Sequence, residues 1–386
     1  MPESSSKGLF DELTIRDVRL ANRIVVSPMC QYSCEEGMAT DWHLVHLGSR
    51  AVGGAALVIA EATAVLPEAR ISPQDLGIWS DAHIEPLARI TRFIHAQGSV
   101  AGIQLAHAGR KGSTVRPWEG AGKVGERQGG WSDILAPSAI PFAANYGMPK
   151  AASVERIAVI VDAFGKAAER ALEAGFRVLE IHSAHGYFLH EFLSPLSNHR
   201  TDAYGGSFEN RSRIVREVVN KTRRVWPERL PLFLRISATD WVEGGWDIEQ
   251  AVELARAVLS LGVDLVDCSS GGNIADATVP LAPGYQVPFA ERIRRDTGIL
   301  TGAVGMITEA RQADDIIRSQ KADLVLIARE MLRDPYWPLH AAAHLGKSIS
   351  WPAQYLRAAA AGTAPRKPTE DFEAVQAVAE GAKIRR

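Results

Sequence analysis

The repeating unit of this chain is clearest in Ala174-Gly175-Phe176-Arg177-Val178-Leu179-Glu180-Ile181, which joins a helix-like segment to a run of apolar and β-branched residues. Gly175 stands where a helix commonly ends in the left-handed conformation. The same kind of junction recurs as Leu261-Gly262-Val263-Asp264-Leu265 and, without glycine, as Gln320-Lys321-Ala322-Asp323-Leu324. A recurring helix-to-strand junction predicts a chain built from repeated strand and helix pairs.

Short apolar runs of this kind predict strands that are buried on both faces, as in a parallel sheet covered by helices. They lie at residues 24–26, 56–59, 100–103, 178–181, 232–236, 265–267, 299–301 and 324–327. Segments with helical spacing lie between them, for example 154–174, 212–225, 248–261 and 309–319. Eight such strands predict an α/β fold of the (β/α)₈ TIM-barrel type as a single domain. An open doubly wound sheet is the alternative.

The segment 106–150 interrupts the alternation, because it is rich in Gly, Pro and Trp and shows little periodicity. It follows the third strand, so we expect a long excursion over the barrel mouth. We place the barrel at residues 8–346 and a C-terminal segment, partly packed at a subunit interface, at 347–386. Beyond Trp351 the chain turns rich in Ala, Lys and Glu, and we expect its end to be disordered or a tag remnant.

Composition favours a cytoplasmic enzyme that acts on small molecules. The chain has 386 residues, 46% of them hydrophobic, and its 43 Lys plus Arg nearly balance 45 Asp plus Glu. This balance gives no broad basic field for nucleic acid or an anionic membrane. Three cysteines, Cys30, Cys34 and Cys268, are too few for a disulfide framework and fit a reducing compartment. Neither an export signal nor a membrane span is evident.

Active residues of a TIM barrel lie at the C-terminal ends of its strands. Polar, titratable and sulfur-bearing side chains follow the first four predicted strands, in segments 27–32, 61–63, 104–111 and 182–187. A pocket lined by reactive groups is therefore predicted at this end of the barrel.

The most distinctive segment, SNHRTDAYGGSFENRSR at 197–213, follows the fourth strand. Together with Pro-Met-Cys-Gln-Tyr at 28–32, Gln-Leu-x-His-x-Gly-Arg at 104–110 and His-x-x-His-Gly-Tyr at 182–187, it resembles the Old Yellow Enzyme family. The resemblance runs from about residue 9 to residue 355 and is strongest to the bacterial xenobiotic reductase and thermophilic-like ene-reductases, because Cys30 follows Pro-Met.

The resemblance implies bound FMN, with NADPH or NADH as the hydride donor. Together with the phosphate seat expected after strands seven and eight, it gives as cofactor-binding residues Ser27, Pro28, Met29, Cys30, Ala62, Gln104, Arg235, Gly305, Ala328 and Arg329. A permanent cation at Arg235 would face the flavin edge that gains negative charge on reduction. The chain departs from the family at Ala328, where Gly usually precedes the arginine.

The implied chemistry is a ping-pong ene-reductase that transfers hydride to the β-carbon of an α,β-unsaturated carbonyl or nitro compound. His182 and His185 would donate hydrogen bonds to the substrate oxygen, and Tyr187 would protonate the α-carbon. Tyr32 also faces the substrate by this resemblance. The physiological role would be detoxification of electrophiles, with no metal involved.

Other readings of the same residues stay open. His182 and His185 could instead hold zinc in a hydrolase, and Cys30 could serve a flavin-based redox sensor. Near the C-terminus, Trp351-Pro352-Ala353-Gln354-Tyr355-Leu356-Arg357 resembles the segment by which relatives extend a residue into a neighbouring subunit's site. Arg357 is the candidate, in a homodimer or homotetramer, although Ala358 to Ala361 replace the aromatic residue that usually follows.

Overall fold

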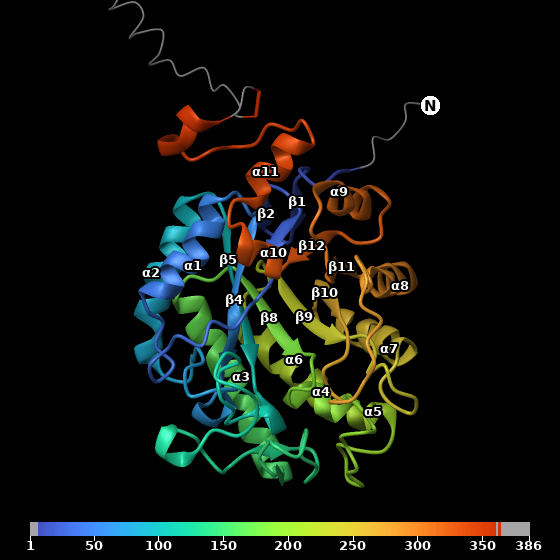
Figure 1. Ribbon diagram of the computed structural model, residues 1–386. Helices are drawn as coiled ribbons and strands as arrows, with labels where there is room; N and C mark the ends of the chain where they lie inside the picture. Colours follow the sequence, from blue (N-terminus) through green and yellow to red (C-terminus); the bar gives the residue numbers. More distant parts are fainter. Residues whose placement is uncertain (1–6, 360–361, 364–386) are drawn as a thin grey trace, which may run out of the picture.

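The computed structural model describes residues 7–359 and 362–363. Eight parallel strands form a closed barrel in the order β3-β4-β5-β8-β9-β10-β11-β12, and β12 pairs back with β3 (Figure 1). Their bounds are β3 Ile24–Val26, β4 Leu57–Ala64, β5 Val100–Ala106, β8 Val178–Ser183, β9 Leu232–Ser237, β10 Leu265–Ser269, β11 Leu300–Ala303 and β12 Leu324–Ile327. The TIM-barrel prediction is confirmed, and the open-sheet alternative is wrong.

The strands are apolar because both of their faces are covered. All residues of these strands are buried except Leu300, which is half-buried. Helices surround the barrel, and the strand residues belong to the buried core. A register shift between Ala60 and Ala62 interrupts the pairing of β4 with β5 close to the mouth. Such bulges redirect side chains next to functional sites.

The helices form a ring around the barrel (Figure 1). The longer ones are α1 Asp41–Val52, α2 Ile84–Ala96, α3 Val154–Glu173, α6 Arg213–Val225, α7 Ile248–Leu259, α8 Val287–Thr297, α9 Ala310–Arg318 and α11 Trp337–His344. Side-chain caps begin two of them, since Ser153 Oγ accepts from Arg156 N at 3.2 Å and Asp247 Oδ1 accepts from Gln250 N at 2.9 Å. The predicted helices agree with α3, α6, α7 and α9 to within two residues at each end.

All three helix-to-strand junctions contain a left-handed residue, which was expected at the two that carry glycine. Gly175 and Gly262 have φ values of 88° and 90°. In the third junction Gln320 takes this role with a φ of 58°, a conformation that is uncommon for a residue with a Cβ atom.

Shorter elements close the two ends of the barrel. The hairpin of β1 (Leu13–Ile15) and β2 (Val18–Leu20) lies at the N-terminal end, at the top of Figure 1, near α11. The excursion 106–150 lies at the opposite end, as predicted, and β6 (Leu135–Ala136) pairs there with β7 (Lys150–Ala151). The remaining elements are α4 Phe188–Leu193, α5 Phe208–Arg211, α10 Arg329–Arg333, η1 Pro67–Ala69, η2 Asp81–His83, η3 Gly109–Lys111, η4 Glu126–Gln128 and η5 Ala353–Ala358.

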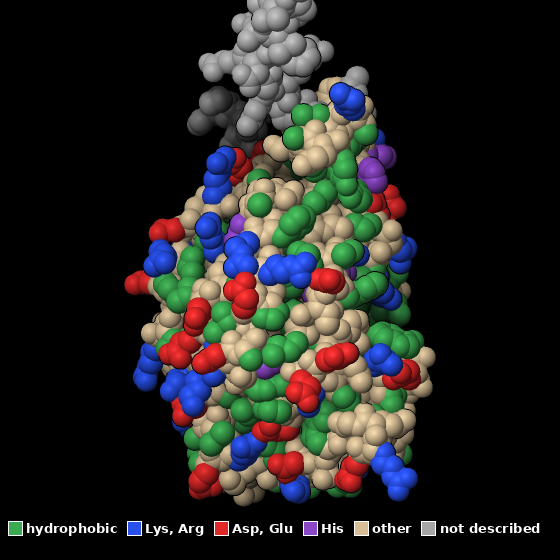
Figure 2. Space-filling model, turned by 90° about the vertical axis from the view of Figure 1, so that its left-hand side faces the viewer, with side chains coloured by type: hydrophobic (Ala, Val, Ile, Leu, Met, Phe, Trp, Pro, Cys, Tyr) green, Lys and Arg blue, Asp and Glu red, His purple; other side chains and the backbone are tan. Residues whose placement is uncertain are grey.

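Acidic and basic side chains are interspersed on the face shown in Figure 2, with no large area of one sign. Within the described residues no helix is long and apolar enough to cross a membrane. In the same part of the chain, no group of three or more His, Cys, Asp or Glu is arranged to hold a metal ion. The expectation about the end of the 347–386 segment lies outside the described residues.

The Gly175 junction gives a test of the repeating unit. A Cβ atom at Gly175 would lie 2.9 Å from Thr91 Oγ1, whereas one at Gly98, which also has a positive φ of 82°, meets nothing within 4 Å. Gly98→Ala should lower the free energy of unfolding by about 1 kcal/mol through backbone strain alone. Gly175→Ala should cost at least about 1 kcal/mol more through overpacking. Urea unfolding measures both, and equal losses would contradict the packing argument.

Candidate active site

A cleft of about 450 Å³ opens at the C-terminal ends of β3, β9, β10, β11 and β12. Its walls contain five of the predicted cofactor residues, namely Ser27, Arg235, Gly305, Ala328 and Arg329. Ser269, Tyr285 and Gln286 line it as well and were not identified from the sequence. These three lie on β10 or in the loop that follows it, and no motif in this part of the sequence marks them as functional.

Arg235 connects the cleft to the interior of the barrel. Its Nε lies 3.0 Å from Asp267 Oδ2 on the neighbouring strand, and its Nη1 donates to Ser27 Oγ at 3.0 Å. Asp267 is fully buried, so the guanidinium neutralises a carboxylate that has no access to water. The cation is thereby held at one position on the cleft wall.

Gln104 lies on β5, buried inside the barrel. Its Nε2 donates to Glu180 Oε1 at 2.7 Å, and the two residues are partners in the register of β5 and β8. Because the Gln104 amide nitrogen donates to Glu180, this hydrogen bond fixes the orientation of the Gln104 amide.

The cleft ends at the loops after β11 and β12. Gly305 has a φ of 108°, and a Cβ atom there would lie 2.8 Å from Gln286 Nε2, so the close approach requires glycine. Ala328 precedes α10 with a φ of −103°, so this turn does not need the positive φ that favours glycine. Arg329 is exposed at the rim.

The predicted substrate residues gather at the end of β8. The ring centroid of His182 lies 5.2 Å from that of His185 and 5.3 Å from that of Tyr187. His185 has a φ of 59°, and its Nε2 lies 2.6 Å from Ser269 Oγ. His182 Nδ1 is buried and has no hydrogen-bond partner in the protein. The two imidazoles and the phenol therefore form one cluster.

Burial keeps all three rings uncharged at neutral pH. Burial, followed by the charge of Arg235, lowers the pKa of His182 and of His185 well below the ordinary value. Burial, followed by Cys30, raises the pKa of Tyr187 well above the ordinary value. The imidazoles can then donate hydrogen bonds as neutral groups, and the phenol retains its proton.

The segment after β3 lies beside this cluster. Tyr32 has a φ of 49°, and its ring makes an edge contact with Trp118 of the excursion at 5.8 Å. Burial, with Asp75 next, raises the pKa of the Cys30 thiol, which therefore stays protonated. Pro28 and Met29 are half-buried between Ser27 and this segment. Ala62 lines a water-sized cavity of about 10 Å³ together with His182 and Tyr187.

Lys111 is a functional candidate that the sequence did not single out. Its Nζ donates to His185 O at 2.7 Å and to Gly272 O, and it lies 5.3 Å from the centroid of the Tyr187 ring. Burial, followed by the charge of Arg110, lowers the pKa of Lys111 to about 7. Lys111 ends the polar segment 104–111 that follows the third predicted strand. The sequence of that segment does not reveal that η3 turns the lysine side chain inward.

Arg357 does not belong to this cluster. It is exposed on η5, and the C-terminal segment of which it is part lies beyond α11, remote from the excursion (Figure 1). A role for it at a neighbouring subunit stays a prediction.

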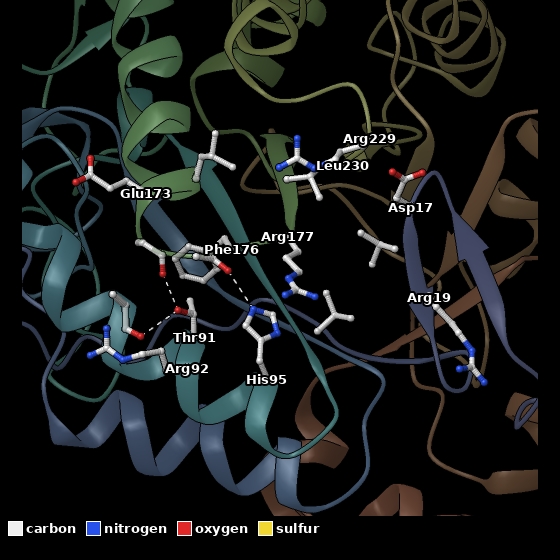
Figure 3. Close-up of a pocket in the computed structure, with 16 residues that line it drawn as sticks. Asp17, Arg19, Thr91, Arg92, His95, Glu173, Phe176, Arg177, Arg229 and Leu230 are labelled. Carbon is white, nitrogen blue, oxygen red and sulfur yellow. Dashed lines mark hydrogen bonds between the residues drawn. The ribbon is translucent and has the colours of Figure 1, made fainter.

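A larger cleft, of about 670 Å³, lies at the N-terminal end of the barrel (Figure 3). Arginines such as Arg177 and Arg229 line it. At the ends of α2 and α3, His95 Nε2 lies 3.0 Å from Gly175 O, and Thr91 Oγ1 donates to Ala174 O at 2.6 Å. The cleft contains none of the predicted site residues, so size alone does not identify the active site.

The model of the NADH:flavin oxidoreductase / NADH oxidase family matches residues 8–348. The chain belongs to this family, the family of Old Yellow Enzyme. It is 49% identical to the NADPH dehydrogenase of Bacillus subtilis, over 91% of this chain and 99% of that protein. It is 51% identical to the NADPH dehydrogenase of Bacillus pumilus, over 91% of this chain and 98% of that protein. This flavin oxidoreductase is thus an NAD(P)H-dependent enzyme with FMN as its cofactor.

Solved structures agree with this assignment. Morphinone reductase superposes with a TM-score of 0.75 at 26% identity, covering 91% of this chain and 93% of that one. The Old Yellow Enzyme homologue from Zymomonas mobilis superposes with a TM-score of 0.74 at 23% identity, covering 94% and 98%, and supports the fold.

The site of this flavin oxidoreductase fits FMN. The cleft carries cations at two places, Arg235 near the barrel interior and Arg329 at the rim, and the backbone of Gly305 lines it as well. His182 Nδ1 is a buried polar atom that lacks a partner within the protein. A flat, polar-edged ring with a phosphate tail matches these groups.

Arg235→Ala should weaken FMN binding and lower the free energy of unfolding by about 3–5 kcal/mol, because Asp267 would be left buried without its cation. The double variant Arg235→Ala/Asp267→Asn removes the orphaned charge. It should regain most of the stability without regaining FMN affinity. Fluorescence titration with FMN and chemical unfolding separate the two effects, and recovery of affinity in the double variant would contradict the role of Arg235.

Proposed function

We propose that this flavin oxidoreductase is an ene-reductase that reduces the C=C bond of α,β-unsaturated carbonyl or nitro compounds. The observation that supports it is the cluster of two neutral imidazoles and one protonated phenol beside the cofactor cleft. Bound FMN supplies the chemistry of taking hydride from NADPH or NADH and delivering it to the β-carbon. The protein supplies hydrogen bonds and a proton.

The two histidines polarise the substrate. Neutral His182 and His185 each donate one hydrogen bond to the carbonyl or nitro oxygen, which becomes more negative as hydride arrives at the β-carbon. Donors of this kind contribute about 2.7–4 kcal/mol each to stabilisation of a transition state. Ser269 Oγ lies 2.6 Å from His185 Nε2 and orients that ring.

Tyr187 protonates the α-carbon. Its raised pKa keeps the proton on the phenol until negative charge develops on the substrate. The nearby ammonium of Lys111 then stabilises the oxygen that loses the proton. The product is a saturated carbonyl or nitro compound, and removal of electrophiles is the physiological role that fits this chemistry.

We further propose that the enzyme works in the cytoplasm as a homodimer or homotetramer. The barrel, 8–346, would then carry the active site, and the segment 347–386 would pack at the subunit interface with Arg357 extending to a neighbouring mouth. Sedimentation velocity of wild type and of Arg357→Ala, with enone turnover, tests this arrangement.

The decisive experiment for the reaction follows the flavin colour. NADPH added without oxygen should bleach the enzyme, and cyclohexenone should restore the colour while yielding cyclohexanone. If the colour returns only with oxygen, the ene-reductase proposal is wrong.

Tyr187→Phe separates the two half-reactions. Bleaching by NADPH should stay within about twofold of wild type, while recolouring by cyclohexenone should slow by about 10²–10⁴, the usual contribution of a general acid. Tyr336→Phe serves as the matched control, because this half-buried tyrosine directly precedes α11 and packs against Tyr355, outside the cluster of imidazoles and phenol. Equal losses in both half-reactions, measured by stopped flow, would contradict the acid role.

The pKa of Lys111 predicts how reoxidation of the flavin by cyclohexenone depends on pH. Its pKa of about 7 means that the ammonium predominates below this pH and the neutral amine above it. Recolouring by cyclohexenone should therefore slow by about tenfold from about pH 6 to about pH 8. Lys111→Met should abolish this step in the pH profile, and an unchanged step would assign it to another group.

A further inference from the structure

Four side chains with strong hydrogen-bonding or charged groups lie on neighbouring strands in the barrel interior, and one of them, Arg235, also lines the cofactor cleft. Gln104 and Glu180 are register partners on β5 and β8, and Arg235 and Asp267 are register partners on β9 and β10. Gln104 donates to Glu180 at 2.7 Å, and Arg235 Nε lies 3.0 Å from Asp267. Two of these residues, Gln104 and Arg235, are ones expected to contact the flavin.

The charges of this cluster do not balance if both acids are ionised. Glu180 and Asp267 are each 0% exposed, and Arg235 is the one cation among the four. Arg235 pairs with Asp267, while Glu180 Oε2 has no hydrogen-bond partner at all. A second buried carboxylate without a counter-ion would be costly, so one proton should be shared between the two acids.

We infer that Glu180 is a proton-binding site coupled to the flavin, which takes up a proton when the cofactor is reduced and so sets how its reduction potential depends on pH. The role rests on FMN binding and not on the proposed alkene substrate. Glu180 acts as a positioning and tuning residue, since it does not line the cleft but accepts a hydrogen bond from Gln104, which is expected to contact FMN.

The electrostatics agree with this assignment. Burial, followed by the charge of Asp267, raises the pKa of Glu180 to about 8, and Arg235 opposes the rise. Burial raises the pKa of Asp267 to about 6, again against Arg235. Near pH 7 the cluster is therefore an ion pair plus a neutral acid, with no net charge. His182, two residues along β8, is neutral under the same conditions.

Reduction of the cofactor couples to protonation of Glu180 through electric charge. Hydride transfer from NADPH would bring two electrons and one proton to FMN, and with Arg235 holding the cofactor as expected it would place negative charge near that residue. That charge disfavours an ionised Glu180, so above about pH 8 the carboxylate takes a second proton from water. Above about pH 8 the reduction potential should fall with pH about twice as steeply as below it. The reason is that two protons, and not one, then accompany the two electrons.

The test is the pH dependence of the flavin potential in the holoenzyme, measured against reference dyes. Wild type should show a break to about double slope near pH 8. Glu180→Gln, which has the same shape and cannot ionise, should give a single slope and a higher potential than wild type above the break. Glu191→Gln is the matched control, because Glu191 is also buried with a pKa raised to about 8 but accepts from Arg110 N, outside the cluster.

A second readout does not depend on activity or on tight FMN binding. Infrared spectra of wild type, with and without FMN, should contain the C=O band of a buried protonated carboxyl that disappears as pH rises through about 8. Subtracting the spectrum of Glu180→Gln should isolate that band. A single slope in wild type, a break that persists in Glu180→Gln, or no titrating band in the difference spectrum would each overturn the inference.

Discussion

The enclosed ion pair of Arg235 and Asp267 is the interaction on which the active end of this barrel depends. It places a permanent cation on the wall of the cleft and holds two neighbouring strands in register at the point where they end. Burial has the larger effect on the pKa of His182 and of His185, and the same cation lowers both pKa values further while limiting the rise in the pKa of Glu180. Closure of the sheet makes this possible, because it brings the C-terminal ends of all eight strands to one mouth.

Much of the architecture could be predicted from the sequence because the barrel repeats. Each strand lies between helices on one side and packed side chains on the other, and this leaves a continuous apolar run such as residues 324–327. Glycine at two of the three junctions marks a backbone requirement that few other residues meet. The β1–β2 hairpin was not foreseen, since three-residue strands carry too little pattern to distinguish them from loops.

The site was predictable only in part, for a different physical reason. His182 lies directly at a strand end and could be placed by counting strands, whereas Arg235 was identified through the resemblance to the family. Lys111, Tyr285 and Gln286 come from loops, whose direction depends on contacts formed far away in the chain. Glu180 was visible as an acid within an apolar strand, but its partner Gln104 lies 76 residues earlier, and only folding shows that they meet.

The excursion after β5 is bound to its neighbours in a way that affects how this enzyme can change. Lys111 donates to the loops after β8 and β10, and Arg110 Nη2 donates to Asn273 O at 2.5 Å in the latter. In many TIM barrels the loops vary separately, so new specificities arise by exchanging them one at a time. Here, replacing one loop alone would leave the buried ammonium of Lys111 without its hydrogen-bond acceptors. Evolution or engineering of this mouth must therefore replace the three loops together, as one inherited block.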